Sequence, residues 1–452
     1  MTRAARSIAS AGDIVACATR TLDAALDPVD FLAAFPGRQR FLWARDAAGE
    51  SIAAVDATAT LEAAGDDRFA DVARGLADLT AAGSLRDGVL VGGFAFDGAA
   101  SGAPPWQDFP AAQLVLPRLA LVRRGDRIRL VASVLGQPCG AQASAHQLLE
   151  RTLSGLGRAV ARGRRARIAA APSRPPTFRV RALAPTAAWR DAVRESLADV
   201  EAGRLDKVVL ARAVELDAGG TLDPLRVVSR LRVAHPGCAV FAVLQGASAF
   251  VGATPELLAR VDGERLESAA VAGSAPRGER ASDDRARAAA LRASVKDRLE
   301  HAAVVDDLVA RLRPLCRRLA VPRAPRILRT AVVQHLWTPL RGRLRHGLGL
   351  LDVAGALHPT PAICGVPRAA ARARVLARES AARGWYGGCL GWLDAADGRS
   401  GELGVAIRTA LIRGDRALLH AGAGLVRGSR WEAELEETRL KLRAMLHALL
   451  EV

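Results

Sequence analysis

Lysine is scarce in this chain, so each lysine is a candidate for chemistry that arginine does not support. Of the 64 lysine and arginine residues, only Lys207, Lys296 and Lys441 are lysine. Arginine stays protonated, whereas a lysine can lose its proton or place a compact ammonium in a tight pocket. Lys207 lies in the strand-like run LDKVVLARAV. We take it as a candidate for one of these two tasks, with chance survival of a lysine as the alternative.

Carboxylates at helical spacing form the second candidate group. Asp297 and Glu300 are three residues apart, and Glu434, Glu437 and Lys441 stand at positions i, i+3 and i+7, so each set shares a helix face. Oxygen ligands without a cysteine or histidine cluster favour Mg²⁺ over zinc. The alternative is a solvated charged face, which is the commoner role of charges on a helix.

Glycine-rich segments precede or follow the expected strands at 271–278, 358–367, 383–392 and 420–429. Glycine lets a ligand approach the backbone closely and leaves amides free to bind anions. None of the segments matches a P-loop or a dinucleotide fingerprint, so nucleotides are not indicated. Ordinary turns are the alternative interpretation of each segment.

The composition limits the class of protein. The net charge is +17, but the arginines are dispersed and aromatic residues make up only 4% of the chain, which argues against nucleic-acid binding and favours a small anionic substrate. No run of 18 apolar residues predicts a membrane span, and the N-terminus has no hydrophobic signal region. The six cysteines form no CxxC pair, which indicates neither zinc sites nor a disulfide framework and fits a reducing cytoplasm.

The elements that must position these residues follow from periodicity. Strands are expected at 88–96, 112–122 and 127–135, and a helix from 186 leads into the strand that carries Lys207. A single long helix is expected over 282–315 with Ser282 as its N-cap, and another helix over 429–452. Segment 157–184 is basic and contains proline, which is typical of a solvated helix end followed by a linker.

Nine motifs, in this order and spacing, carry a family resemblance: KVVLAR, TPELL, AGSAPRG, KDRLEH, VQHL, LHPTPAICG, RGWYGG, AIRTA and GAGLVRGSRWEAELEETRLK. They resemble the chorismate-utilising enzymes closely over 185–450, and VGGFAFD and WQDFP extend the likeness more loosely toward the N-terminus. The resemblance implies one large α+β domain over 1–452, with two packed, mostly antiparallel sheets surrounded by helices. Residues 1–156 would be its more variable part, 157–184 linker-like, and 185–452 the part bearing the catalytic motifs.

Within that family the HPTPAICG segment resembles the members that add water to chorismate, and AGS at 272–274 resembles isochorismate synthases rather than salicylate synthases. The resemblance implies Mg²⁺-dependent interconversion of chorismate and isochorismate in menaquinone or siderophore biosynthesis. Water would attack C2 while the C4 hydroxyl departs. Salicylate synthase, which also eliminates pyruvate, is the alternative enzyme. A basic nucleic-acid-binding or scaffold protein is the alternative of a different class. No glutaminase signature is present, and a monomer without partner proteins is expected.

The resemblance also implies a role for each matching residue. Lys207 would be the general base and Glu256 the general acid, on opposite sides of the substrate ring. The metal set would be Glu300, Glu437, Glu434 and, through water, Asp297. The substrate-binding set would be Gly273, Ser274, His335, Tyr386, Arg408, Gly422, Gly424 and Lys441. For His335 the alternative is a core histidine with satisfied hydrogen bonds. Lys296 has no assigned role, and Trp431 replaces a proline common in the family, which leaves the placement of Glu434 to be determined.

Overall fold

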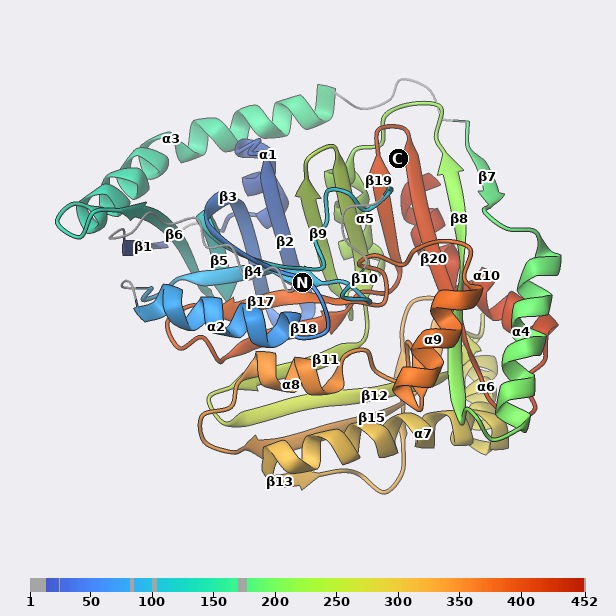
Figure 1. Cartoon of the computed structure of the whole chain (residues 1–452). Coiled ribbons are helices and arrows are strands. Elements are labelled where there is room, and N and C mark those ends of the chain that lie inside the picture. Colours follow the sequence, from blue (N-terminus) through green and yellow to red (C-terminus); the bar gives the residue numbers. More distant parts are fainter. Residues whose placement is uncertain (1–13, 24, 82–84, 100–103, 170–176, 451–452) are drawn as a thin grey trace.

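The protein is described here by a computed structural model covering residues 14–23, 25–81, 85–99, 104–169 and 177–450 (Figure 1). The strands are β1 Ile14–Leu22, β2 Gln39–Arg45, β3 Glu50–Ala63, β4 Val89–Phe94, β5 Ala112–Arg124, β6 Arg127–Gly136, β7 Arg179–Ala182, β8 Lys207–Asp217, β9 Ala239–Gln245, β10 Ser248–Thr254, β11 Leu257–Asp262, β12 Arg265–Pro276, β13 Cys316–Ala320, β14 Arg326–Arg329, β15 Val333–Leu344, β16 Gly365–Val366, β17 Cys389–Asp394, β18 Gly401–Val405, β19 Thr409–Arg413 and β20 Arg416–Leu425. The helices are α1 Pro28–Ala34, α2 Arg68–Ala81, α3 Ala141–Ala169, α4 Thr186–Glu201, α5 Pro224–Ala234, α6 Ala281–Ala293, α7 Val295–Leu312, α8 Leu350–Leu357, α9 Arg368–Arg378 and α10 Trp431–Leu450.

The α+β class is confirmed, but the two sheets are limbs of one hydrogen-bonded sheet. The first limb has the order β7–β8–β20–β19–β10–β9–β2–β3–β5–β6–β1, and the second continues from β5 as β4–β17–β18–β11–β12–β15, with β13 and β14 both beside β15. The short β16 pairs with β8, and every pairing among the described strands is antiparallel. The limbs meet because β5 pairs with β4 through its first half and with β6 through its second.

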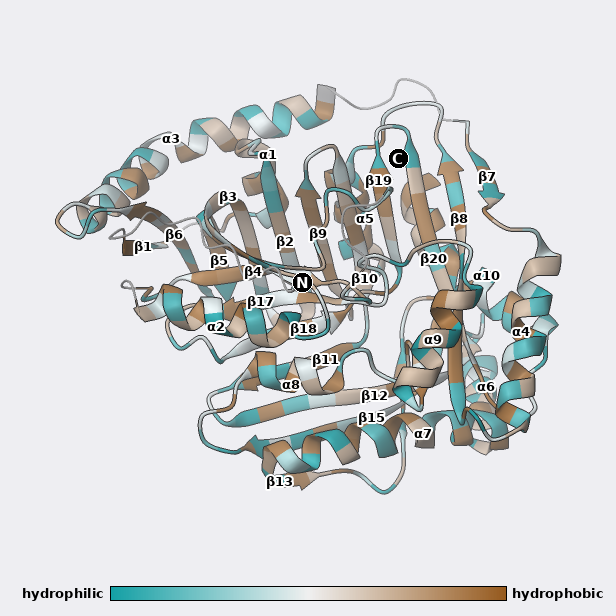
Figure 2. Ribbon diagram, in the orientation of Figure 1, coloured by the Kyte–Doolittle hydropathy of each residue, from teal (hydrophilic) through white to brown (hydrophobic). Residues whose placement is uncertain are grey.

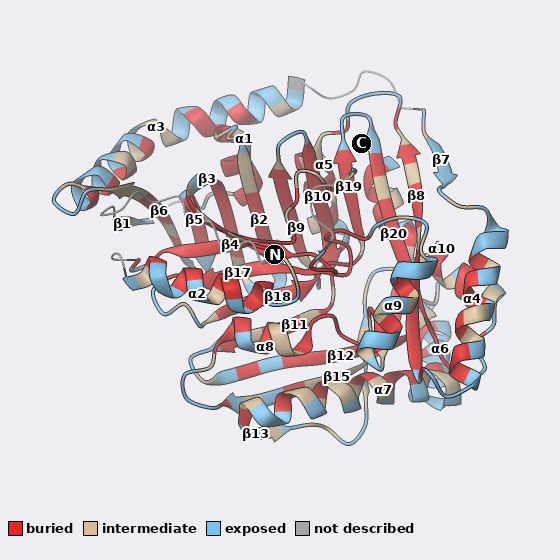
Figure 3. Ribbon diagram, viewed as in Figure 1, coloured by how far each residue is buried: buried red, intermediate tan, exposed pale blue. Residues whose placement is uncertain are grey.

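The main core lies between the two limbs. Successive residues of a strand point to opposite faces of the sheet, so one strand can contribute to two apolar clusters. In β2, Phe41 and Trp43 belong to this core, whereas Leu42 and Ala44 belong to a second cluster under α1, α3 and α5. Figures 2 and 3 show the result, with apolar, buried strands inside and more polar, exposed surfaces on the outer helices. No helix of the described residues is long and apolar enough to cross a membrane.

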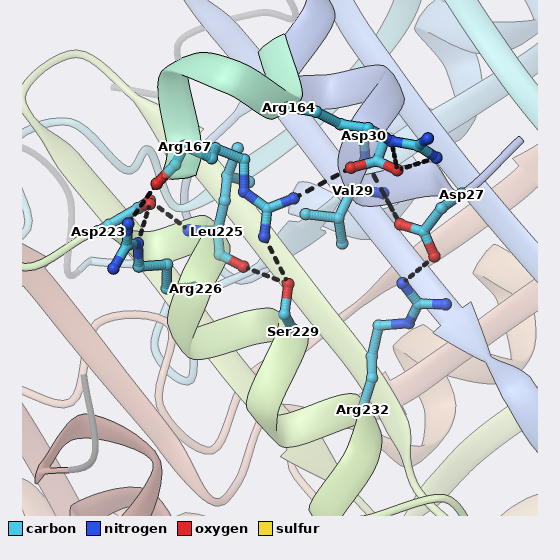
Figure 4. A network of polar contacts seen from close by, with 10 residues as sticks. All are labelled: Asp27, Val29, Asp30, Arg164, Arg167, Asp223, Leu225, Arg226, Ser229 and Arg232. Atoms are coloured by element: carbon cyan, nitrogen blue, oxygen red, sulfur yellow. Dashed lines mark hydrogen bonds and ion pairs between the residues drawn. The ribbon is translucent and has the colours of Figure 1, made fainter. Parts of the chain in front are cut away.

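The segment expected to be linker-like is partly regular structure. Its first part forms the end of α3, its residues 170–176 lie outside the described part, and Arg179–Ala182 pairs with β8 as β7. Arg164 and Arg167 on α3 form ion pairs with Asp30 on α1, at 2.6 Å and 3.2 Å, and Arg167 also donates to Ser229 on α5 at 3.0 Å (Figure 4). The basic run therefore connects three helices rather than remaining free in solvent up to residue 169.

The single helix expected over 282–315 is wrong in one respect. The chain forms two helices, α6 and α7, because Ser294 adopts an extended conformation between them. The Ser294 hydroxyl accepts a hydrogen bond from the Asp297 amide at 3.2 Å and so caps α7, whereas the expected N-cap Ser282 lies inside α6. The break starts a new helix at the residues that carry Asp297 and Glu300. The expected strands at 88–96, 112–122 and 127–135 are present as β4, β5 and β6.

Candidate active site

One cavity brings together residues that are up to 232 positions apart in the chain, from Val209 to Lys441. Eleven of the residues expected to act in the site line it: Glu256, Gly273, Ser274, Glu300, His335, Tyr386, Arg408, Gly422, Gly424, Glu437 and Lys441. They come from β12, β15 and β20, from α7 and α10, and from the connections before β11, β17 and β19. Lys207, Asp297 and Glu434 are placed directly behind this lining by the contacts described below.

Lys207 is fully buried at the start of β8, and its Nζ lies 3.1 Å from Glu300 Oε1. Its Nζ makes no hydrogen bond to any described residue. Gly424 on the neighbouring strand makes room for this pair. A Cβ there would lie 2.2 Å from Glu300 Oε1 and 3.1 Å from Lys207 Cε, so a larger residue would displace the Glu300 carboxylate from its contact with Lys207.

Glu256 lies between β10 and β11 and is 5% exposed. Burial raises the pKa of its carboxyl to about 7, although the nearby charges of Lys207, Arg408 and Lys441 act in the opposite direction. The site thus contains a buried carboxyl that holds a proton near neutral pH and a buried lysine. Such a pair can supply a general acid and, once the lysine loses its proton, a general base.

His335 and the β12 bulge form one wall. Gly273 has φ +72° at a register shift in β12, and its neighbour Ser274 has Oγ 2.9 Å from His335 Nδ1. Burial lowers the pKa of His335 to about 3, so the ring is neutral and serves to position Ser274. A Cβ at Gly273 would lie 3.1 Å from Asp297 Cβ, so the bulge also allows α7 to approach β12.

Another part of the lining carries a hydroxyl and two cationic side chains, from Tyr386, Arg408 and Lys441. Burial raises the pKa of Tyr386 to about 12, which keeps its hydroxyl protonated as a hydrogen-bond donor. The Tyr386 ring stacks on His420 with the ring centroids 4.9 Å apart. Arg408 occupies a left-handed conformation, with φ +55°, in the turn before β19. Lys441 Nζ donates to Gly422 O at 2.8 Å, so the charge of α10 is anchored to β20.

Each of the three lysines pairs with a different glutamate of the expected metal set. Besides the Lys207–Glu300 pair, Lys296 Nζ lies 2.5 Å from Glu434 Oε1, and Lys441 Nζ lies 2.6 Å from Glu437 Oε1. Within the described residues, no three aspartate, glutamate, histidine or cysteine side chains meet as a preformed metal cluster. Lys296, which has no role assigned from sequence, therefore forms an ion pair with Glu434.

The donor chemistry nevertheless suits a hard cation. Glu434 is fully buried, its Oε2 makes no hydrogen bond within the described part of the chain, and burial followed by repulsion from Glu437 raises its pKa to about 7. A divalent cation would relieve both the desolvation and the repulsion. With Trp431 in place of the proline common in the family, α10 begins at Trp431, and Glu434 lies against Lys296.

Comparisons with known proteins agree with this geometry. A family model described as chorismate binding enzyme matches residues 4–450. The chain belongs to the chorismate-binding enzyme family. Among its relatives in this family, the salicylate biosynthesis isochorismate synthase of Pseudomonas aeruginosa is 36% identical over 409 residues, which cover 86% of this chain and 80% of the relative. The isochorismate synthase MenF of Bacillus subtilis is 34% identical over 369 residues, covering 80% and 74%.

A solved structure of the same chorismate-binding family extends the likeness to three dimensions. The menaquinone-specific isochorismate synthase MenF from Escherichia coli superposes with a TM-score of 0.78 at 26% identity, covering 99% of this chain and 96% of that one. The fold expected from the motifs is therefore confirmed over nearly the full length, including the N-terminal part where the motif resemblance was loose.

The sequence analysis missed a buried ion pair behind the site. Arg383 donates to Glu379, to Ile363 O at 2.8 Å and to Val209 O at 2.9 Å, while Glu379 accepts from the Ala211 amide at 2.7 Å. Ile363 and Val209 line the cavity, and β8 also carries the base candidate. The only available signal was the position of Arg383 in RGWYGG, three residues before Tyr386, in a segment interpreted for its glycines.

Proposed function

We propose that this chorismate-binding enzyme is an isochorismate synthase. The observation that carries the proposal is the combination of a buried lysine and a buried carboxyl with a raised pKa at one cavity that also contains Arg408 and Tyr386. This combination provides the acid, the base and the anion-binding groups that hydroxyl exchange on a carboxylate-bearing ring requires. The names of the relatives from Pseudomonas aeruginosa and Bacillus subtilis support the same reaction.

The proposed reaction assigns one step to each of the two groups. Lys207, once neutral, takes a proton from a water molecule as the water oxygen forms a bond to C2 of chorismate. The ring double bonds shift, the C4–O bond breaks, and Glu256 gives its proton to the departing hydroxyl, which leaves as water. One water enters and one leaves, so substrate and product are isomers and the reaction runs in both directions. Arg408 and Tyr386 would hold the enolpyruvyl carboxylate, as a cationic fork and a hydroxyl donor.

We further propose that Glu300, Glu434 and Glu437 hold Mg²⁺, with Asp297 in support through water. Bound there, the ion would neutralise the ring carboxylate of the substrate. Lys441 and the strand glycines Gly422 and Gly424 complete the pocket. The six cysteines are all free, which supports a reducing, cytoplasmic setting.

Separation of the products after incubation with chorismate and Mg²⁺ tests the proposal. Isochorismate should form without pyruvate, and it should be absent both in EDTA and with the Lys207→Ala variant. Lys207→Arg should be equally inactive, because arginine keeps its proton. Salicylate together with pyruvate would assign the salicylate synthase reaction instead. Unchanged chorismate would refute an isochorismate synthase.

A further inference from the structure

A second cavity of about 590 Å³ lies between α2, α8, α9 and the end of α7, which are near one another in Figure 1. We call it the α2–α9 cavity. Within the described residues, it shares no lining residue with the active-site cavity. Its volume is in the range of small-molecule sites in proteins. The family motifs and the proposed reaction leave it without a role.

Arginines dominate the interior of the α2–α9 cavity. Four of them line it: Arg68, Arg311, Arg368 and Arg372. Arg311 pairs with Asp307 at 2.7 Å, and Arg372 pairs with Asp97 at 2.8 Å. Arg68 and Arg368 form no ion pair with any described residue. They donate only to backbone carbonyls, at 2.7–3.1 Å.

The two arginines without an ion pair, Arg68 and Arg368, present positive charge to the cavity. Arg68 is 4% exposed, and burial lowers its pKa and lowers that of Arg368 to about 10. Burial and the charges of these two arginines lower the pKa of His358, in the same lining, to about 3, so the histidine is neutral. Arg68 is buried and Arg368 is half-buried, and neither guanidinium forms an ion pair with a described residue. The carboxylates of Asp97 and Asp307, whose charges reach Arg68 and Arg368, are themselves paired with Arg372 and Arg311. An anion beside the two guanidiniums would therefore be favoured.

The acidic residues of the lining do not cancel this charge. Asp66, Asp67 and Asp352 are exposed at the rim, where solvent and salt screen them. Asp66 also pairs with Arg372 at 3.3 Å. The remaining wall is largely apolar and includes the rings of Phe69 and Phe96. Positive charge inside and aromatic surface beside it suit a ligand that has both an anionic group and an apolar body.

We propose that the α2–α9 cavity binds a small organic anion. Its carboxylate or phosphate would lie beside Arg68 and Arg368, and its aromatic or apolar body against Phe69 and Phe96. The ligand would act as an effector, because this cavity and the active site share a wall. Binding does not depend on the proposed function, whereas the effect on turnover rests on it.

The wall between the two cavities consists of a chain segment that reaches both and of a contact between Phe96 and Arg383. His358 and Pro359 line the α2–α9 cavity, and Ile363 of the same segment lines the active site. Phe96 also lines the α2–α9 cavity, and the guanidinium of Arg383 lies 4.3 Å from its ring centroid. Because Arg383 holds the Ile363 carbonyl, a ligand that moves Phe96 or His358 changes the position of active-site backbone.

Calorimetric titration with benzoate, in phosphate-free buffer and without chorismate, tests binding. Benzoate should bind, neutral benzamide of the same shape should bind at least tenfold more weakly, and inorganic phosphate should compete with benzoate. Ala70→Phe fills the cavity from α2 and should weaken benzoate binding at least tenfold. Ala77→Phe adds the same ring at an exposed alanine of α2 outside the lining and should leave it unchanged. Arg368→Met should weaken binding by a similar factor through loss of charge.

Three results would overturn the binding site: no benzoate binding, equal binding of benzamide, or equal binding by the two phenylalanine variants. Equal binding by both variants would place benzoate elsewhere, for example beside Arg408. The effector role is tested separately by chorismate turnover with and without benzoate, which should change kcat/KM in Ala77→Phe but not in Ala70→Phe. A change in neither would refute the effector role. Absence of turnover in all samples would refute the proposed function and leave the binding result standing.

Discussion

The protonated state of Glu256 can be tested through stability, independently of activity. Burial moves the pKa of this carboxyl from 4.5 to about 7 in the folded protein. In the unfolded chain the proton is lost around pH 4.5, so the folded state binds one more proton between these values. Folding is thus favoured at low pH, and this contribution is lost as the pH rises through 7. From pH 5 to pH 8 the loss is about 2 to 3 kcal/mol, at about 1.4 kcal/mol per pKa unit.

Glu256→Gln removes the titration and keeps the shape of the side chain. A chain of this length unfolds with an entropy of roughly 1 kcal/mol/K. The difference in Tm between the native protein and this variant should therefore change by about 2 to 3 °C from pH 5 to pH 8. The Tm of the native protein should fall more than that of the variant. Differential scanning calorimetry measures it, and other titrating groups cancel in the difference. Glu267→Gln, which removes an exposed carboxylate from β12, is the matched control and should show no such shift. A difference that is constant from pH 5 to pH 8 would refute a carboxyl that is protonated at neutral pH.

Three further predictions concern the supports of the site. Arg383→Lys keeps the charge but loses the contacts to two backbone carbonyls, so kcat/KM should fall by roughly 10- to 100-fold, or about 1.4 to 2.7 kcal/mol. Fluorotyrosine at Tyr386, the single tyrosine, should give one ¹⁹F signal, and this signal should shift in the variant. An unshifted signal with full activity would contradict the positioning role of Arg383. Gly424→Ala should abolish activity and lower Tm because of the 2.2 Å approach to Glu300, whereas Gly220→Ala, with open space around it, should change neither. Mg²⁺ should raise Tm in the native protein, and Glu437→Gln should weaken Mg²⁺ binding at least tenfold by calorimetry; unchanged affinity would remove Glu437 from the metal set.

Local patterns allowed the strands and most helices to be predicted from sequence. The alternation and apolar content of 112–122 and 127–135 predicted β5 and β6, and the spacing of three and four predicted α4. The break at Ser294 was missed because the apolar positions on both sides continue one helical period. In the fold, Ser294 is extended and caps α7, and Gly273 allows Asp297 to approach β12 closely.

The candidate site could be predicted as a set of residues but not as a network. Motif resemblance named eleven of the residues that line the cavity, yet it could not show that every lysine has a glutamate partner, because Lys296 and Glu434 are 138 positions apart. The Arg383–Glu379 pair was missed for a similar reason. Its importance lies in which backbone carbonyls it holds, and those belong to segments joined only in the folded sheet.

The reaction itself is tested most directly by turnover of chorismate in H₂¹⁸O with Mg²⁺, with mass analysis of the product after short reaction times. Attack by an external water activated by Lys207, with departure of the C4 hydroxyl, predicts isochorismate that carries one ¹⁸O at C2. Isochorismate without the label would contradict the assigned roles of Lys207 and Glu256, and the absence of isochorismate would contradict the proposed function.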